Sequence, residues 1–308
     1  MIISASRRTD IPAFYGRWLI NRLREGFVYV RNPFNHRQVS KIILSPDVVD
    51  CIIFWTKNPV PFFPYLQEID DLGYSYYFQF TLTPYDDRIE KNLPSKESLV
   101  DAFIKLAELI GSQRVIWRYD PILLAEDISP SYHQKHFLDL ASKLRGSTER
   151  CIISFLDLYA KTKRNTKSLK LQTITEEHMK LLGGFLASIG ADYNLELFTC
   201  AEAIDLSALG IKKGKCVDDE LIESITKSTL EVHKDKNQRK ECGCVESVDI
   251  GAYNSCAHNC LYCYANDSLS TTTARISTHR PSSPFLLGEL KDEDLITMRG
   301  YRTQLVKE

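Results

Sequence analysis

The sequence contains no apolar run long enough to cross a membrane, and it has almost no net charge. No segment reaches the roughly 18 consecutive apolar residues that suggest a membrane-spanning helix. Its 39 basic and 40 acidic residues nearly cancel, so no overall electrostatic field draws the protein to nucleic acid or to a membrane surface. The opening residues, MIISASRRTDIP, also lack the long apolar core of a secretory signal. We therefore expect a cytoplasmic protein with no membrane partner.

The motifs of several common enzyme classes are absent as well. The sequence has no glycine-rich loop for phosphate, no hydrolase nucleophile motif and no zinc-protease motif. Apart from His258, the histidines follow no spacing typical of metal ligands. The chemistry of this protein is therefore to be sought among its nine cysteines.

The cysteines are too many and too clustered for ordinary core residues. A reducing compartment disfavours disulfides, so metal binding or thiol chemistry is the better explanation. The odd number of cysteines, and the presence of five of them within residues 242–263, argue the same way. Cys51 and Cys151 differ from the rest because each begins an apolar run, and we expect both to be buried as small hydrophobic side chains.

Six strand-like apolar runs alternate with amphipathic helical patterns, which is typical of parallel α/β architecture. The runs are 2–6, 51–55, 76–83, 114–117, 151–158 and 193–199, with a hairpin inserted at 28–44. The pattern predicts a partial (β/α)6 barrel of the TIM type over residues 1–210. Residues 211–308 show little periodicity, and we expect a cysteine-rich cap packed on the barrel and ordered by an iron–sulfur site.

Polar side chains gather where the predicted strands end, which is where parallel βα folds place their active sites. Lys57, Arg118 and Asp120 are assigned to catalysis, and Thr83 and Glu196 to cofactor binding. Singly, each of these residues is compatible with an ordinary loop position. Together, they predict an active site at the carboxyl ends of the strands.

The segment NSCAHNCLYCYAN, residues 254–266, carries the most specific pattern in the chain. Its cysteines, Cys256, Cys260 and Cys263, are spaced C-x3-C-x2-C with Tyr262 before the last. Three thiolates on a short loop suit three irons of a 4Fe–4S cluster and leave the fourth iron open. The alternative is a zinc site that His258 would complete.

This motif is the hallmark of the radical S-adenosylmethionine (radical SAM) superfamily, which the loop resembles. The longer string is similar to the branch of spore photoproduct lyase and DNA repair photolyases, as are WTKNP at 55–59 and RYDPIL at 118–123. The whole chain also resembles a bacterial family of unknown function that has a radical-SAM-like cysteine cluster near its C-terminus. SASRRTDIP at 4–12 and CGCVESVDIGAYN at 242–254 belong to that resemblance.

The resemblance implies a 4Fe–4S cluster, S-adenosylmethionine as cofactor, Tyr262 beside the adenine, and an electron donor such as flavodoxin or ferredoxin. One departure is clear: the superfamily places its cysteine loop after the first barrel strand, whereas here the loop follows the last. We expect residues 247–253 to form a permuted strand that leads into the loop.

Four cysteines remain in or near the tail: Cys200, Cys216, Cys242 and Cys244. Four thiolates saturate either a second 4Fe–4S cluster or a zinc ion, and free thiols are the third possibility. We predict an auxiliary metal site, with a second cluster as the first choice. The reason is that a tail with little hydrophobic periodicity needs metal binding to order it.

These observations predict a radical SAM enzyme that cleaves S-adenosylmethionine reductively and acts on an unknown substrate. The alternatives are a non-catalytic iron–sulfur protein for electron transfer or sensing, and a zinc-dependent nucleic-acid-binding protein. Two locally basic stretches, 1–41 and 161–170, are either solvated surface or a contact for an anionic substrate. A nucleic acid substrate has no support beyond the photolyase-like motif.

Overall fold

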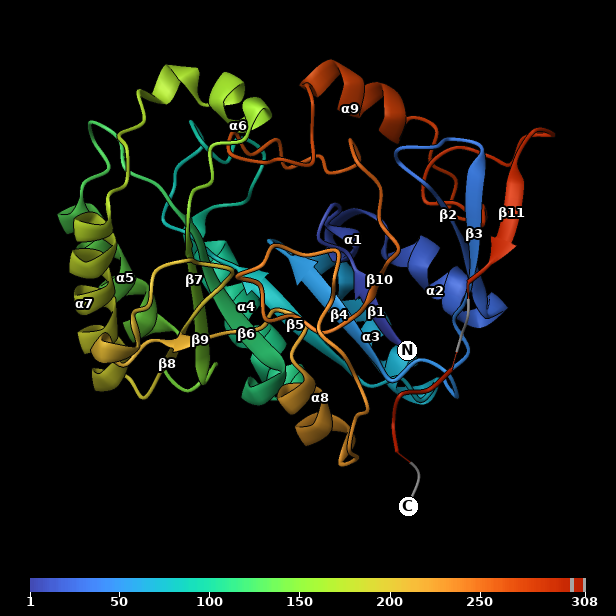
Figure 1. Cartoon of the computed structure of the whole chain (residues 1–308), viewed down its shortest axis with the longest axis horizontal. Coiled ribbons are helices and arrows are strands. Elements are labelled where there is room, and N and C mark those ends of the chain that lie inside the picture. Colours follow the sequence, from blue (N-terminus) through green and yellow to red (C-terminus); the bar gives the residue numbers. More distant parts are fainter. Residues whose placement is uncertain (300–301, 307–308) are drawn as a thin grey trace.

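The main sheet of the protein is built on the six apolar runs. The computed structural model describes residues 1–299 and 302–306 (Figure 1). The six strands are β1 (Ile2–Ala5), β4 (Cys51–Thr56), β5 (Tyr76–Thr81), β6 (Val115–Ile122), β7 (Arg150–Phe155) and β8 (Glu196–Thr199). They pair in chain order and all in parallel. The prediction of a parallel α/β sheet is confirmed.

The tail adds a strand at each edge of this sheet. β9 (Lys212–Lys213) pairs with β8, and β10 (Val248–Asp249) pairs with β1, giving the order β10-β1-β4-β5-β6-β7-β8-β9. The strand expected within 247–253 therefore exists, although only two of its residues pair. In the described residues no ladder joins β10 to β9, so the sheet does not close into a barrel.

Helices flank the sheet on the connections between strands. They are α1 (Ile11–Phe14), α2 (Gly16–Glu25), α3 (Leu66–Asp71), α4 (Lys96–Ile110), α5 (Pro130–Lys143), α6 (Ala160–Asn165), α7 (Glu176–Asp192), α8 (Asp219–Thr226) and α9 (Leu269–Ile276). Short 3-10 turns lie at Val60–Tyr65, Ser112–Arg114, Lys167–Leu169 and Ser207–Leu209.

Helix α4 shows how local sequence sets these elements. Ser95 caps it by accepting a hydrogen bond from the Ser98 backbone, Gly111 ends it, and the side chains of Leu99, Phe103 and Leu106 are buried. None of the described helices is long and apolar enough to cross a bilayer.

The insertion between β1 and β4 forms most of a second, smaller sheet. Strands β2 (Phe27–Arg31) and β3 (Gln38–Ile43) form the expected antiparallel hairpin. Strand β11 (Leu295–Met298), which the sequence pattern did not indicate, pairs in parallel with β3. The tail thus reaches both sheets.

The side chains of each strand alternate between two buried clusters. Phe54, Phe78 and Trp117 pack with the helices, whereas Ile53, Tyr77 and Ile116 face the other way. The second cluster is completed by tail residues, including Val217, Leu221, Val245 and three cysteines. Figure 1 shows this part of the tail, in orange, crossing the strands. Cys51 and Cys151 are both fully buried, as predicted.

His133, on α5, is buried within the core and gives a first test of the fold. Its Nε2 lies 2.8 Å from the Leu123 carbonyl oxygen and its Nδ1 lies 2.8 Å from the Tyr119 hydroxyl. Burial lowers the pKa of His133 from its usual 6.5 to about 4. As the pH falls, His133 therefore becomes protonated in the unfolded chain before it does so in the folded protein. The stability that the neutral, buried imidazole provides is lost as the pH falls from about 6.5 towards about 4.

We expect wild-type protein to lose about 2–3 kcal/mol of unfolding free energy relative to His133→Asn between about pH 7 and about pH 4.5. Urea unfolding of the two proteins across this range measures the difference, and other titrating groups cancel in the comparison. A stability difference that stays constant with pH would show that His133 titrates normally.

Candidate functional site

A cavity of about 670 Å³ lies at the carboxyl ends of the parallel strands. Each of the six main strands contributes to its wall, through Arg7, Lys57, Thr81, Asp120, Ser154 and Cys200. Because the ends of parallel strands meet at one edge of a sheet, residues distant in sequence converge there. The polar strand ends therefore share one cavity.

All seven cysteines outside the strands line this same cavity. They are Cys256, Cys260 and Cys263 of the loop, and Cys200, Cys216, Cys242 and Cys244. We call the first set the loop cysteines and the second set the tail cysteines. The two sets are separated in the sequence, and the fold brings both to the same cavity.

The loop that carries Cys256, Cys260 and Cys263 follows β10 and is held at both ends. The Asn254 backbone N–H donates to the Ala265 carbonyl (3.0 Å), and the Asn266 amide donates to the Cys256 carbonyl (2.8 Å). The Leu261 N–H donates to the carbonyl of Ile89 (2.9 Å) in the connection after β5. These bonds fix the loop without any ligand.

Asp249 on β10 anchors the start of this loop to β1. Its carboxylate accepts hydrogen bonds from Ser4 Oγ (2.9 Å) and Ser6 Oγ (2.7 Å) and forms an ion pair with Arg8 (2.8 Å). A two-residue strand gains little from backbone pairing alone, so these side-chain bonds define its register.

His258 lies inside the loop and is tied to the first two strand ends. Its Nε2 is 2.7 Å from Asp10 Oδ2, and the same carboxylate oxygen accepts the Lys57 backbone N–H at 2.7 Å. The other ring nitrogen, Nδ1, is buried and has no hydrogen-bond partner among the described residues. Asp10 therefore positions the loop against the sheet through both His258 and the backbone after β4.

Glu90 joins three of the predicted site residues in one buried network. Its carboxylate accepts hydrogen bonds from Lys57 Nζ (2.7 Å), Thr83 Oγ1 (2.8 Å) and the Tyr262 hydroxyl, and it pairs with Lys96. Burial by itself would raise the pKa of Glu90, but the two lysines outweigh it and hold the pKa at about 2. Glu90 is therefore an anion that orients a lysine beside Cys260.

The sequence did not single out Glu90. It lies in an irregular, polar stretch between β5 and α4, where a lone glutamate looks like solvated surface. Only the fold reveals that its side chain is 1% exposed and faces two lysines. A buried carboxylate of this kind leaves no local sequence signal.

Arg118, which is buried, and Asp120, which is partly buried, form a second ion pair on β6, facing the cavity. Arg118 Nη2 contacts the Asp120 carboxylate, which also accepts the Ser154 hydroxyl. The other arginine nitrogen, Nη1, lies 2.7 Å from Cys216 Sγ. The predicted catalytic residues Lys57, Arg118 and Asp120 thus share the cavity with both sets of cysteines.

Glu196 does not join them. Strand β8 begins at Glu196 rather than at residue 193, because the chain turns through Asn194 in a left-handed conformation (φ 55°). Glu196 therefore lies at the amino end of the strand, half exposed, and pairs with Lys212 at 2.7 Å. Its expected position at the rim was wrong, and it is not among the residues that line the cavity.

Burial favours the protonated form of the three loop thiols. Burial raises the pKa of Cys256 well above its usual value, raises that of Cys260 to about 12, and raises that of Cys263. Lys57 partly opposes the shift at Cys260. Because a metal binds the thiolate form, ligation at these positions must release protons.

The tail cysteines are in closer mutual contact. Cys200 Sγ and Cys216 Sγ are 2.9 Å apart, and the backbone N–H groups of Cys216 and Val217 donate to Cys244 Sγ at 3.2 and 3.4 Å. The Cys244 thiol in turn donates to Cys242, which lowers the pKa of Cys242 to about 7. The four thiols form one connected group.

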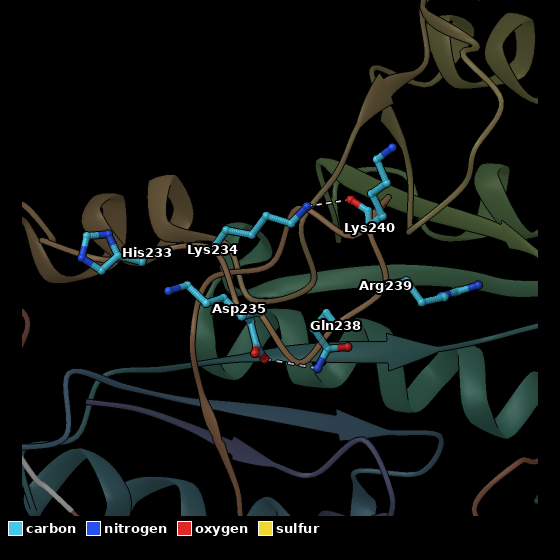
Figure 2. Close-up of a pocket in the computed structure, with 7 residues that line it drawn as sticks. His233, Lys234, Asp235, Gln238, Arg239 and Lys240 are labelled. Atoms are coloured by element: carbon cyan, nitrogen blue, oxygen red, sulfur yellow. Dashed lines mark hydrogen bonds between the residues drawn. The ribbon is translucent and has the colours of Figure 1, made fainter.

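A basic turn leads into Cys242 and Cys244 (Figure 2). Lys234 Nζ donates to the Lys240 carbonyl (2.6 Å), and the Gln238 amide donates to Asp235 (3.2 Å). Figure 2 shows these two bonds bracketing the turn, with the Arg239 side chain extending away from both. Arg239 forms an ion pair with Asp157, so the turn is fastened to the end of β7.

In residues 1–299 and 302–306, no three histidine, cysteine or acidic side chains are already arranged so that they could hold a metal ion. The predicted metal ligation therefore stays a prediction. The loop cysteines nevertheless suit a cluster whose thiolates bind separate irons: they line one cavity, and the Ala265 N–H donates to Cys263 Sγ at 3.4 Å. His258 lines the same cavity, and its Nδ1 is buried with no hydrogen-bond partner among the described residues.

A family model matches most of the chain. No curated protein and no solved structure matches the chain. A model of the family described as "Domain of unknown function (DUF1848)" matches residues 2–265, which include the strands of the main sheet and the loop cysteines. The chain belongs to the DUF1848 family.

Proposed function

We propose that this protein is a radical SAM-like iron–sulfur enzyme. The observation that carries the proposal is the placement of Cys256, Cys260 and Cys263 on one fixed loop, in the wall of a cavity formed by the carboxyl ends of the parallel strands. When bound, a 4Fe–4S cluster with one open iron would supply an electron for the reductive cleavage of S-adenosylmethionine to a 5′-deoxyadenosyl radical, which abstracts hydrogen from a substrate.

The position of β10 supports this function despite the permuted sequence. In the superfamily that the loop resembles, the cysteines follow the first strand of a partial barrel. Here β10 is the first strand of the sheet in space, next to β1, and the cysteine loop follows it directly. A permuted partial barrel would then place the cysteine loop at the cavity, in the position where that superfamily places its own loop.

The chain's own groups have distinct tasks in this proposal. The three loop thiolates would hold the cluster, with the Ala265 N–H stabilising the charge on Cys263. Lys57 Nζ lies 5.4 Å from the centre of the Tyr262 ring and is held there by Glu90. The Tyr262 ring and the Lys57 ammonium group would bind the adenine and an anionic part of the cofactor or substrate.

Arg118 and Asp120 would face the reacting end of the substrate. Both side chains are directed by neighbours, Arg118 by Cys216 and Asp120 by Ser154. A buried cation beside a partly buried anion favours a ligand that carries both charges, such as the amino acid moiety of S-adenosylmethionine or a zwitterionic substrate. Burial within the cavity strengthens these contacts and limits the access of water.

An electron paramagnetic resonance measurement tests for an open iron. Anaerobically reconstituted protein, reduced with dithionite, should show a 4Fe–4S signal that changes shape when S-adenosylmethionine is added. S-adenosylhomocysteine, which lacks the sulfonium methyl group, is the control for the sulfonium-specific part of that change. A signal unchanged by S-adenosylmethionine would favour an electron-transfer or sensor protein, and a colourless zinc protein would favour the nucleic-acid-binding alternative.

A further inference from the structure

We propose that the tail cysteines, Cys200, Cys216, Cys242 and Cys244, bind one thiophilic divalent ion, with zinc as the fitting metal. This site is separate from the loop cysteines and does not depend on the function proposed above. Binding converts four thiols and one divalent ion into a tetrathiolate complex of charge −2 and releases four protons, with no change in oxidation state.

The fold brings these four residues together from three segments of the chain. Cys200 directly follows β8, Cys216 lies between β9 and α8, and Cys242 and Cys244 flank a glycine after the turn shown in Figure 2. The turn is closed by the Asp235 N–H donating to the Cys244 carbonyl (2.9 Å) and by the Cys242 N–H donating to the Arg239 carbonyl (3.0 Å). The backbone that carries Cys242 and Cys244 is therefore fixed by hydrogen bonds.

The short distance between the sulfurs of Cys200 and Cys216 favours one ion over an iron–sulfur cluster. Four thiolates around zinc, each at ≈ 2.3 Å, lie about 3.8 Å from one another at the corners of a tetrahedron. Cys200 Sγ and Cys216 Sγ are 2.9 Å apart, so they need to separate by about 1 Å to share an ion. In a 4Fe–4S cluster each thiolate binds a different iron, and the sulfurs must stand much farther apart.

Hydrogen bonds already point at the ligand sulfurs. The backbone N–H groups of Cys216 and Val217 both donate to Cys244 Sγ, and the Arg118 guanidinium donates to Cys216 Sγ at 2.7 Å. Donors of this kind stabilise negative charge on a metal thiolate and orient it. Neutral, buried thiols gain little from such donors, whereas metal-bound thiolates at Cys216 and Cys244 would gain from them.

The surrounding charge also fits a dianionic complex. Arg7 lies near Cys216 and Cys244, and its Nη2 is buried with no hydrogen-bond partner among the described residues. Its guanidinium carbon lies 5.3 Å from the centre of the Trp55 ring. A buried cation with an unused donor calls for a nearby anion. The tetrathiolate complex supplies that anion beside both Arg7 and Arg118.

The site explains how an irregular tail is held on the sheet. Cys216, Cys242 and Cys244 belong to the same buried cluster as Val217 and Val245, but regular structure between β9 and β10 is confined to the short helix α8. An ion shared by three segments links this tail to the end of β8. The metal would act as a structural cross-link beside the active cavity.

Metal content of the triple variant Cys256→Ala/Cys260→Ala/Cys263→Ala tests the site independently of the loop. We expect this protein, purified with zinc present and then desalted, to retain about one zinc per chain. Adding Cys242→Ala and Cys244→Ala should reduce zinc to background. Cobalt substitution of the triple variant should give the thiolate charge-transfer and tetrahedral ligand-field bands of a tetrathiolate site, and these bands should be absent from the five-residue variant.

A folded triple variant, verified by circular dichroism, that holds no zinc would overturn the proposal. The proposal also fails if the variant binds iron with sulfide in place of zinc, or if mass spectrometry under non-reducing conditions shows a Cys200–Cys216 disulfide in freshly purified protein. Cys200→Ser is the mild single-ligand variant for the case in which the double replacement prevents folding; it should weaken zinc retention against a chelator at least tenfold. Cys151→Ala, at a buried cysteine outside the cavity, is the matched control and should retain zinc as the parent does.

Discussion

The Cys260→Ala protein should assemble no 4Fe–4S cluster, and its iron content after anaerobic reconstitution should fall from about four per chain to background. Cys260 lies in the middle of the loop, and its removal leaves two thiolates where three are needed to hold the cluster. The tail cysteines line the same cavity, but in the described part of the chain their thiols contact one another, so we do not expect one of them to take the place of Cys260. The brown colour and visible absorption of the cluster should disappear with the iron.

Cys151→Ala is the matched control for this loss. Cys151 is also a buried cysteine, but it lies on β7 outside the residues that line the cavity. Its replacement should cost about 1 kcal/mol of stability, from the lost packing of the sulfur, while iron content stays at the wild-type value. If Cys260→Ala retained a full cluster, or if Cys151→Ala lost it, the assignment of the loop cysteines would be wrong.

Glu90→Gln should reduce the free energy of unfolding by about 3–5 kcal/mol at neutral pH. The substitution keeps the shape of the side chain but removes the negative charge that Lys57 and Lys96 share. Lys57 is only 14% exposed and Lys96 24% exposed, so both ammonium groups would remain largely buried without a counter-ion. Urea unfolding of the metal-free proteins measures the loss without interference from cluster assembly.

The control for Glu90→Gln is the same substitution at an exposed pair. Glu68 and Arg24 form a surface ion pair at 2.5 Å, and Glu68→Gln should cost no more than about 1 kcal/mol. Because the folded-state pKa of Glu90 is held at about 2, its contribution should persist down to about pH 4.5 and disappear as the pH falls towards 2. Equal effects of the two substitutions would contradict the buried network.

The strands and the cysteine loop could be predicted because their signals are local. The apolar runs at 51–55 and 76–83 correspond to β4 and β5, and the C-x3-C-x2-C spacing places three sulfurs on one loop whatever the fold. The run at 114–117 was too short, because β6 continues to Ile122 with an irregular register after Tyr119. Arg118 and Asp120 therefore lie within a strand and not in the connection after it.

The contacts that complete the site are long-range, and the sequence pattern does not record them. Glu90 meets Tyr262, and Asp10 meets His258, across most of the chain. The edge strand β10 pairs only two residues and owes its place to Asp249, whose partners are in the first ten residues. The grouping of the tail cysteines likewise follows from where β8, β9 and the turn before Cys242 end. None of these depends on periodicity, so only the fold reveals them.

The formation of 5′-deoxyadenosine tests the central claim most directly. Anaerobically reconstituted wild-type protein, reduced with dithionite and given S-adenosylmethionine, should release 5′-deoxyadenosine and methionine even without its substrate, and the Cys260→Ala protein should release neither. A wild-type protein that carries four irons per chain and still forms no 5′-deoxyadenosine would contradict the account.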